Sequence, residues 1–151
     1  MAAVTPAVPA VRTVHATCVA IGRIGVLIRG RSGSGKSDLA LRLLDGGARL
    51  VADDRVGLER DGDRLVARPP RELAGLLEVR GLGIVRLAHR ASATVGLVVD
   101  LDIAPDRLPR RRSCVVAGVR LPWLALDARH ASAPAKLRLR CGDPASKVRA
   151  R

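Results

Sequence analysis

The chain has 151 residues, 48% of them hydrophobic, so it is long enough for one compact domain around a single core. Its net charge is +13, and it contains one tryptophan and no other aromatic residue. A chain without stacking aromatics or a nucleic-acid-binding motif is not expected to recognise a specific nucleic acid, so the charge favours an acidic protein partner or reflects codon usage.

In chain order, residues 1–13 contain Pro6 and Pro9 and are expected to form a disordered tail ahead of a domain at 14–136. Two short apolar runs follow, Thr17 to Ile21 and Gly25 to Ile28, and predict the strands of a hairpin. The second run leads into a complete G-x-x-x-x-G-K-[ST] pattern. Its residues, all expected to bind the phosphates of a nucleotide, are Gly30, Arg31, Ser32, Gly33, Ser34, Gly35, Lys36 and Ser37.

This glycine-rich loop predicts a phosphate site because its glycines let several backbone N–H groups point at the same oxygens. Lys36 supplies a positive charge for the β- and γ-phosphates, and the Ser37 hydroxyl is a ligand for Mg²⁺. Apolar residues at helical spacing follow, with Gly46-Gly47 as a stop, so the N-terminus of a helix adds its dipole to the site. Strand, loop and helix in this order disfavour a chance glycine-rich turn and predict binding of a nucleoside triphosphate.

Two adjacent carboxylates, Asp53 and Asp54, follow the next apolar strand. Neighbouring residues on a strand point to opposite faces, so the two are expected to do different work unless the strand ends there. One can support Mg²⁺, and the other can face the acceptor as a general base for phosphoryl transfer. The alternative is that Asp54 opens a turn while Asp53 pairs with an arginine.

A lone acid, Glu78, stands in the apolar stretch before Gly81-Leu82-Gly83. Such a charge is rare unless it is paired or bound to a metal, so Glu78 is a candidate second metal ligand. An exposed edge strand with a Glu78–Arg80 pair explains the pattern equally well.

The rest of the chain predicts mostly strands. A hairpin is expected around Asp61-Gly62, and a short helix at Pro70 to Leu76. From residue 137 onward the chain is rich in arginine and is expected to form a basic tail. Further strands are expected at Thr94 to Leu101, Ser113 to Ala117 and Val119 to Leu126. The fold class is therefore α/β, with more strand than a doubly wound nucleotide-binding domain.

The three cysteines, Cys18, Cys114 and Cys141, lie far apart and form no Cys-x-x-Cys pair. This spacing argues against a disulfide framework or a zinc site and is typical of the reducing cytosol. The apolar runs are shorter than a membrane span. A cytoplasmic location without membrane contact is expected.

Several of these motifs together resemble the catalytic domain of HPr kinase/phosphorylase, an enzyme that phosphorylates a serine of the phosphocarrier HPr. The resemblance rests on Val14 to Val56, which holds the phosphate loop and the Val-Ala-Asp-Asp run, and on Leu77 to Ile84. His15, Lys36, Asp54 and Glu78 stand at the spacing that the family uses. The family's separate N-terminal domain is expected to be absent.

The resemblance implies a strand-rich mixed sheet of the HPr kinase and phosphoenolpyruvate carboxykinase type, with ATP and Mg²⁺ as cofactors and an HPr-like phosphocarrier as partner. It implies that Ser37 and Glu78 hold Mg²⁺, that Asp54 is the base, and that His15 and Arg107 belong to the active site. It also implies a homo-oligomer, a hexamer in the family. The family's Gly-Arg-Asn loop, linked to the reverse phosphorylase reaction, has no match, so kinase activity is the expectation. The alternative is a nucleotide-sensing regulator without catalysis.

Overall fold

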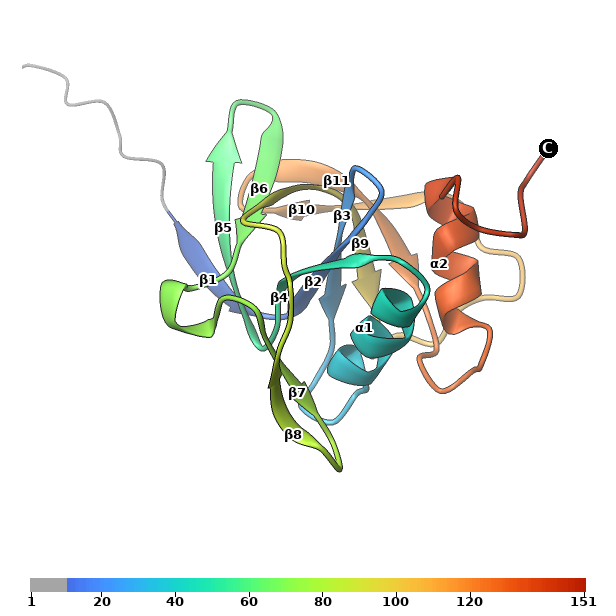
Figure 1. The fold of residues 1–151 in the computed structure, drawn as a ribbon. Helices are drawn as coiled ribbons and strands as arrows, with labels where there is room; N and C mark the ends of the chain where they lie inside the picture. Colours follow the sequence, from blue (N-terminus) through green and yellow to red (C-terminus); the bar gives the residue numbers. More distant parts are fainter. Residues whose placement is uncertain (1–10) are drawn as a thin grey trace, which may run out of the picture.

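The computed structural model describes residues 11–151, and its body is a nine-stranded mixed sheet with helices on one face (Figure 1). A separate two-stranded hairpin, β7–β8, projects from the body. The elements in chain order are β1 (Arg12–His15), β2 (Thr17–Ile21), β3 (Ile24–Arg29), α1 (Lys36–Asp45), β4 (Arg49–Ala52), β5 (Arg55–Asp61), β6 (Arg64–Arg68), the 3-10 turn η1 (Arg71–Leu73), β7 (Leu76–Val79), β8 (Gly83–Arg86), β9 (Ala93–Asp100), β10 (Arg112–Val116), β11 (Val119–Ala125) and α2 (Ala133–Cys141).

The strand order is β1-β5-β6-β9-β3-β2-β4, and β11 pairs with the end of β9 and with β10. Strands β3, β9 and β11 are parallel. Strand β4 runs in the same direction as β3, because β2 lies between them and is antiparallel to both. The carboxyl ends of β4, β3, β9 and β11 therefore meet at one edge of the sheet, which is where open α/β sheets bind ligands.

The core has two layers, one on each face of the sheet. Strand β3 is buried on both faces, since Val26 and Ile28 belong to the layer under the helices and Leu27 belongs to the other. Helix α1 contributes buried Leu39 and Leu43 to the helical layer. Full burial of one such side chain stabilises the fold by roughly 1.5–3 kcal/mol. The phosphate loop therefore connects a strand and a helix that are both packed into the core.

Most of the expected elements are confirmed. The hairpin β2–β3 pairs Thr17 with Ile28, and β5–β6 form the hairpin after the two carboxylates. The expected helix at 70–76 is only the 3-10 turn η1, because Leu76 already begins β7. The expected tail at 1–13 falls mostly on residues 1–10, outside the described part of the chain, and its last two residues belong to β1.

The expected basic tail from residue 137 is wrong over its first five residues, which belong to helix α2. Leu137 is fully buried in the helical layer of the core. Pro134 stands in the first turn of α2, and Gly142 ends the helix in a left-handed conformation with φ +64°. The folded unit therefore extends beyond residue 136, because an apolar face of α2 packs beside α1.

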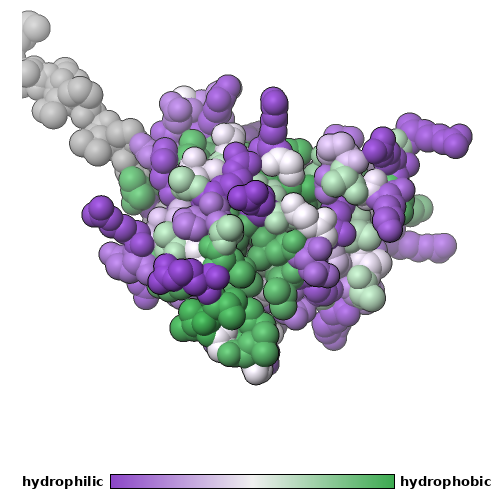
Figure 2. All heavy atoms as spheres, viewed as in Figure 1, coloured by the Kyte–Doolittle hydropathy of each residue, from purple (hydrophilic) through white to green (hydrophobic). Residues whose placement is uncertain are grey.

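The β7–β8 hairpin carries exposed apolar side chains near its tip. Leu82 and Ile84 are 79% and 71% exposed. Figure 2 shows a continuous apolar area over the lower part of the molecule, where Figure 1 places this hairpin. No helix within residues 11–151 has the length and hydrophobicity that a membrane span requires.

Candidate active site

The phosphate loop follows β3 and has the geometry that an anion site requires. Gly33 and Gly35 have φ values of +81° and +98°, which residues with a side chain rarely adopt. Helix α1 begins at Lys36, so the N–H groups of its first turn have no acceptor within the helix. The Lys36 ammonium group donates to the carbonyl oxygens of Gly30 (2.8 Å) and Arg31 (3.0 Å), which places its charge over the loop. The loop therefore combines free N–H donors, a helix dipole and a lysine.

Asp53 lies beside the loop at the end of β4 and is only 5% exposed. Its Oδ1 accepts hydrogen bonds from the Ser37 hydroxyl (2.7 Å) and the Thr17 hydroxyl (2.9 Å). Its Oδ2 accepts one from the backbone N–H of Glu78 (3.2 Å). These partners come from α1, β2 and β7, so Asp53 joins three elements at the sheet edge. Within the described residues no arginine pairs with Asp53, so the alternative in which Asp53 forms an ion pair with an arginine is wrong.

Asp54 is turned away from Asp53 by a tight turn. The backbone N–H of Arg55 donates to the carbonyl of Asp53 (2.7 Å), and Asp54 between them has φ +67°. This is a γ-turn, a strained conformation that is concentrated at functional sites. The Asp54 side chain is 68% exposed, and its Oδ1 lies 3.8 Å from Nδ1 of His15. Strand β1 brings His15 there, because its register with β5 places His15 opposite Arg55. The two carboxylates do have different environments.

Two other expected site residues are not assembled with these. The Glu78 side chain is exposed, and only its backbone contacts Asp53. No cluster of three potential metal-ligating side chains forms among residues 11–151. Arg107 lies exposed in the segment between β9 and β10 and, within the described residues, makes no hydrogen bond or ion pair. The structure thus places Asp53 against the phosphate loop and His15 beside the neighbouring Asp54, but it brings neither the Glu78 side chain nor Arg107 to them.

The donor set at Ser37 and Asp53 fits Mg²⁺. A hydroxyl and a carboxylate oxygen held 2.7 Å apart are the hard oxygen ligands that this ion takes, and it usually keeps waters and phosphate oxygens as its other ligands. Two protein ligands are therefore sufficient at such a site.

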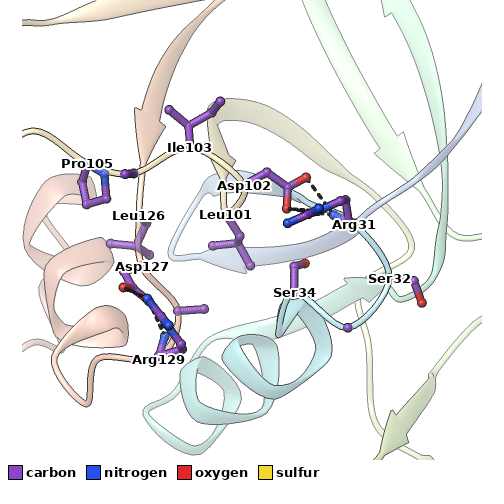
Figure 3. Close-up of a pocket in the computed structure, with 13 residues that line it drawn as sticks. Arg31, Ser32, Ser34, Leu101, Asp102, Ile103, Pro105, Leu126, Asp127 and Arg129 are labelled. Carbon is purple, nitrogen blue, oxygen red and sulfur yellow. Dashed lines mark hydrogen bonds and ion pairs between the residues drawn. The ribbon is translucent and has the colours of Figure 1, made fainter.

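A cavity of about 560 Å³ lies on the other side of the loop (Figure 3). Its walls are the phosphate loop and the segments that follow β9 and β11, so the parallel strands bring together three parts of the chain. Residues lining it are Arg31, Ser32, Gly33, Ser34, Leu101, Asp102, Ile103, Ala104, Pro105, Leu126, Asp127, Ala128 and Arg129.

Sequence reasoning missed Thr17 and Asp102. Thr17 stands in an apolar strand, and only the strand order places it against Asp53. Both carboxylate oxygens of Asp102 accept from the backbone N–H of Arg31, at 3.1 and 2.9 Å. Asp102 thereby fixes the start of the phosphate loop to the end of β9. No local motif marks either residue.

The family model of the HPr Serine kinase C-terminal domain matches residues 7–103 of the chain, a segment that includes the loop and both carboxylates. The chain belongs to this family. Arg107 lies beyond the matched segment.

Similar proteins agree with this assignment. The HPr kinase/phosphorylase of Geobacillus kaustophilus is 45% identical over 98 residues, which is 60% of this chain and 32% of that protein. The one of Lacticaseibacillus casei is 43% identical over 105 residues, 64% of this chain and 33% of that protein. This chain thus spans about a third of the length of these curated relatives.

Among solved structures, the Hpr(Ser) kinase/phosphatase from Coxiella burnetii matches with a TM-score of 0.73 and 27% sequence identity. The match covers 83% of this chain and 91% of that one. The expected fold class, an α/β domain of the HPr kinase type with a strand-rich mixed sheet, is confirmed.

Proposed function

We propose that this member of the HPr kinase family is an ATP- and Mg²⁺-dependent protein kinase that phosphorylates a serine of an HPr-like phosphocarrier. The observation that carries the proposal is the pair of carboxylates beside the phosphate loop. Asp53 is buried against Ser37, whereas Asp54 is exposed and faces His15. A kinase needs these two environments, one for the metal and one for the acceptor.

In the proposed reaction the loop amides and Lys36 bind the β- and γ-phosphates. Bound Mg²⁺ would neutralise charge on the phosphate oxygens, held by Ser37 and Asp53. Asp54 accepts the proton of the serine hydroxyl as its oxygen bonds to the γ-phosphorus, and the bond to the ADP oxygen breaks. His15, whose Nδ1 lies 3.8 Å from Oδ1 of Asp54, is the ionisable group beside this base. The Glu78 side chain and Arg107 would reach the site only through a change of conformation on binding, because Glu78 contacts Asp53 through its backbone alone and Arg107 lies exposed.

A protein partner fits the surroundings of the acceptor side. The Glu78 backbone joins the β7–β8 hairpin to Asp53, and the tip of this hairpin exposes Leu82 and Ile84. Exposed apolar patches of this kind mark protein contacts. We propose the phosphocarrier as the partner by family membership, and assembly into a homo-oligomer on the same ground.

The decisive experiment is transfer of the labelled γ-phosphate of ATP to the organism's own HPr-like protein in the presence of Mg²⁺, with the modified residue mapped by mass spectrometry. The Asp54→Asn variant removes the base, so transfer is expected to fall about 10²–10⁴-fold while ATP still binds. Asp63→Asn is the matched control, because it removes the same charge from the exposed turn between β5 and β6 and is expected to keep full activity.

Label on a carrier serine that is lost only in Asp54→Asn would establish the kinase. Normal ATP binding without label on any carrier would contradict it. The chain would then be a nucleotide-sensing regulator, an alternative that the separation of Glu78 and Arg107 from the site favours.

A further inference from the structure

We propose that the 560 Å³ cavity beside the phosphate loop holds the nucleoside of the bound nucleotide, with its base between the guanidinium groups of Arg31 and Arg129. The same arrangement gives little discrimination between adenine and guanine. The inference rests on the proposed nucleotide site and extends it from the phosphates to the base.

The position of the cavity supports this assignment. Along the sheet edge the order is β4, β2, β3, β9 and β11, so Asp53 after β4 and the cavity after β9 and β11 lie on opposite flanks of the phosphate loop. A nucleotide whose terminal phosphate lies on the Asp53 flank has its nucleoside on the other. Residues 31–34 of the loop form one wall of the cavity, so phosphate site and cavity are continuous.

The size and the lining of the cavity are those of a small-molecule site. Its volume falls within the roughly 300–1,000 Å³ range of ligand pockets. Leu101, Ile103 and Leu126 give it an apolar wall, and Ile103 is 46% exposed. Ser34 of the phosphate loop also lines the cavity and adds a polar residue to its wall.

Arg31 and Arg129 stand on opposite sides of the cavity (Figure 3). Their side chains are 87% and 89% exposed, and each is held by a carboxylate. The Arg31 Nε lies 3.5 Å from Asp102, and two nitrogens of Arg129 donate to the two oxygens of Asp127 at 3.0 and 2.9 Å. Hydrogen bonds from Arg129 hold the pKa of Asp127 well below its usual range, so this pair stays ionised at every physiological pH.

Guanidinium planes are suited to stack on the faces of a base. They are the stacking groups available here, because Trp123 is the only aromatic residue of the chain and packs in the other core layer. Every base presents a π-face, so recognition by stacking tolerates different bases. Low selectivity between adenine and guanine follows from stacking of the base on the two guanidinium groups.

Calorimetric titration of the full chain with ATP, GTP and inorganic tripolyphosphate, each with Mg²⁺, tests the proposal. Tripolyphosphate occupies the phosphate loop but has no base. Arg129→Ala is expected to weaken ATP and GTP binding about 10-fold and tripolyphosphate less than about 2-fold. In the wild type, ATP and GTP are expected to bind within about 3-fold of each other. Arg23→Ala is the matched control, because it removes an exposed arginine at the opposite end of β3.

Equal weakening of all three ligands by Arg129→Ala, or of none, would overturn the nucleoside site while leaving the phosphate site intact. A wild-type preference above about 100-fold for one base would overturn the stacking geometry. If the wild type bound none of the three ligands, the proposed nucleotide-binding function itself would fail, and the nucleoside site with it.

Discussion

At the scale of single residues, the site depends on what surrounds two neighbouring carboxylates. Asp53 has three hydrogen-bond donors and is buried, so its charge is stabilised by Ser37, Thr17 and the backbone of β7. Asp54 is exposed and has only His15 nearby, at 3.8 Å. The γ-turn at Asp54 separates them, because its positive φ reverses the direction in which the next side chain leaves the backbone.

This difference predicts unequal effects of the same substitution on stability. Asp53→Asn loses acceptor capacity toward buried hydroxyls and is expected to lower the free energy of unfolding by about 1–3 kcal/mol. Asp54→Asn is expected to change it by less than about 0.5 kcal/mol, as for an exposed residue. Urea unfolding of both variants measures this. Equal destabilisation would show that Asp53 does not join the elements as described.

At the scale of elements, two arginines tie the helices to the site. Arg42 of α1 donates to the carbonyls of Ala128 and His130, next to the cavity wall. Arg138 of α2 donates to the carbonyls of Arg42 and Leu43 near the end of α1, at 3.2 and 3.3 Å. A cation at a helix C-terminus satisfies free carbonyls and the helix dipole. Helix α2 therefore supports the helix that carries the phosphate loop.

Replacing Arg138 tests this support. Arg138→Ala removes both hydrogen bonds and is expected to lower the free energy of unfolding by about 1–3 kcal/mol. Arg140→Ala, an exposed arginine on the same helix, is expected to change it by less than about 0.5 kcal/mol. Thermal or urea unfolding of the two variants provides the comparison, and similar stabilities would argue that α2 does not stabilise α1 through Arg138.

At the scale of the whole molecule, the close packing of the sheet affects a buried thiol. Cys18 of β2 is fully buried in the core layer on the sheet face away from the helices, and burial raises its pKa from 9.0 to about 12. The folded state keeps this thiol protonated where the unfolded chain loses its proton. Stability from this group is therefore complete below about pH 9 and is lost as the pH rises toward about 12.

The expected result is a steep loss of stability above pH 9. Burial also raises the pKa of the Cys141 thiol, to about 11, and that of the Cys114 thiol, so these groups contribute to the same slope and the share of Cys18 is isolated by replacing it alone. In Cys18→Ala the fall in unfolding free energy between pH 9 and 11 is expected to be shallower by up to about 1.4 kcal/mol per pH unit. Urea unfolding at several pH values measures the slope, and an unchanged slope in the variant would refute the assignment.

The sequence alone determined the phosphate loop, its strand and helix, the hairpin β2–β3 and the candidate carboxylates. These signals are local: glycine spacing, apolar periodicity and charged residues at the end of an apolar run lie within a few residues of each other. The family resemblance added His15, which no local pattern would have selected. Helix α2 was missed although Pro134 and Gly142 mark its ends. Its apolar face is short, and its sequence is rich in arginine.

Only the tertiary structure determined which residues lie on each side of the phosphate loop. The strand order inserts β2 between β3 and β4, which places Thr17 against Asp53, and parallel pairing of β3, β9 and β11 gathers three distant segments into the cavity. It also left Arg107 and the Glu78 side chain outside the cluster. Such contacts join residues far apart in the chain, and they are set by strand pairing and core packing rather than by any neighbouring residue.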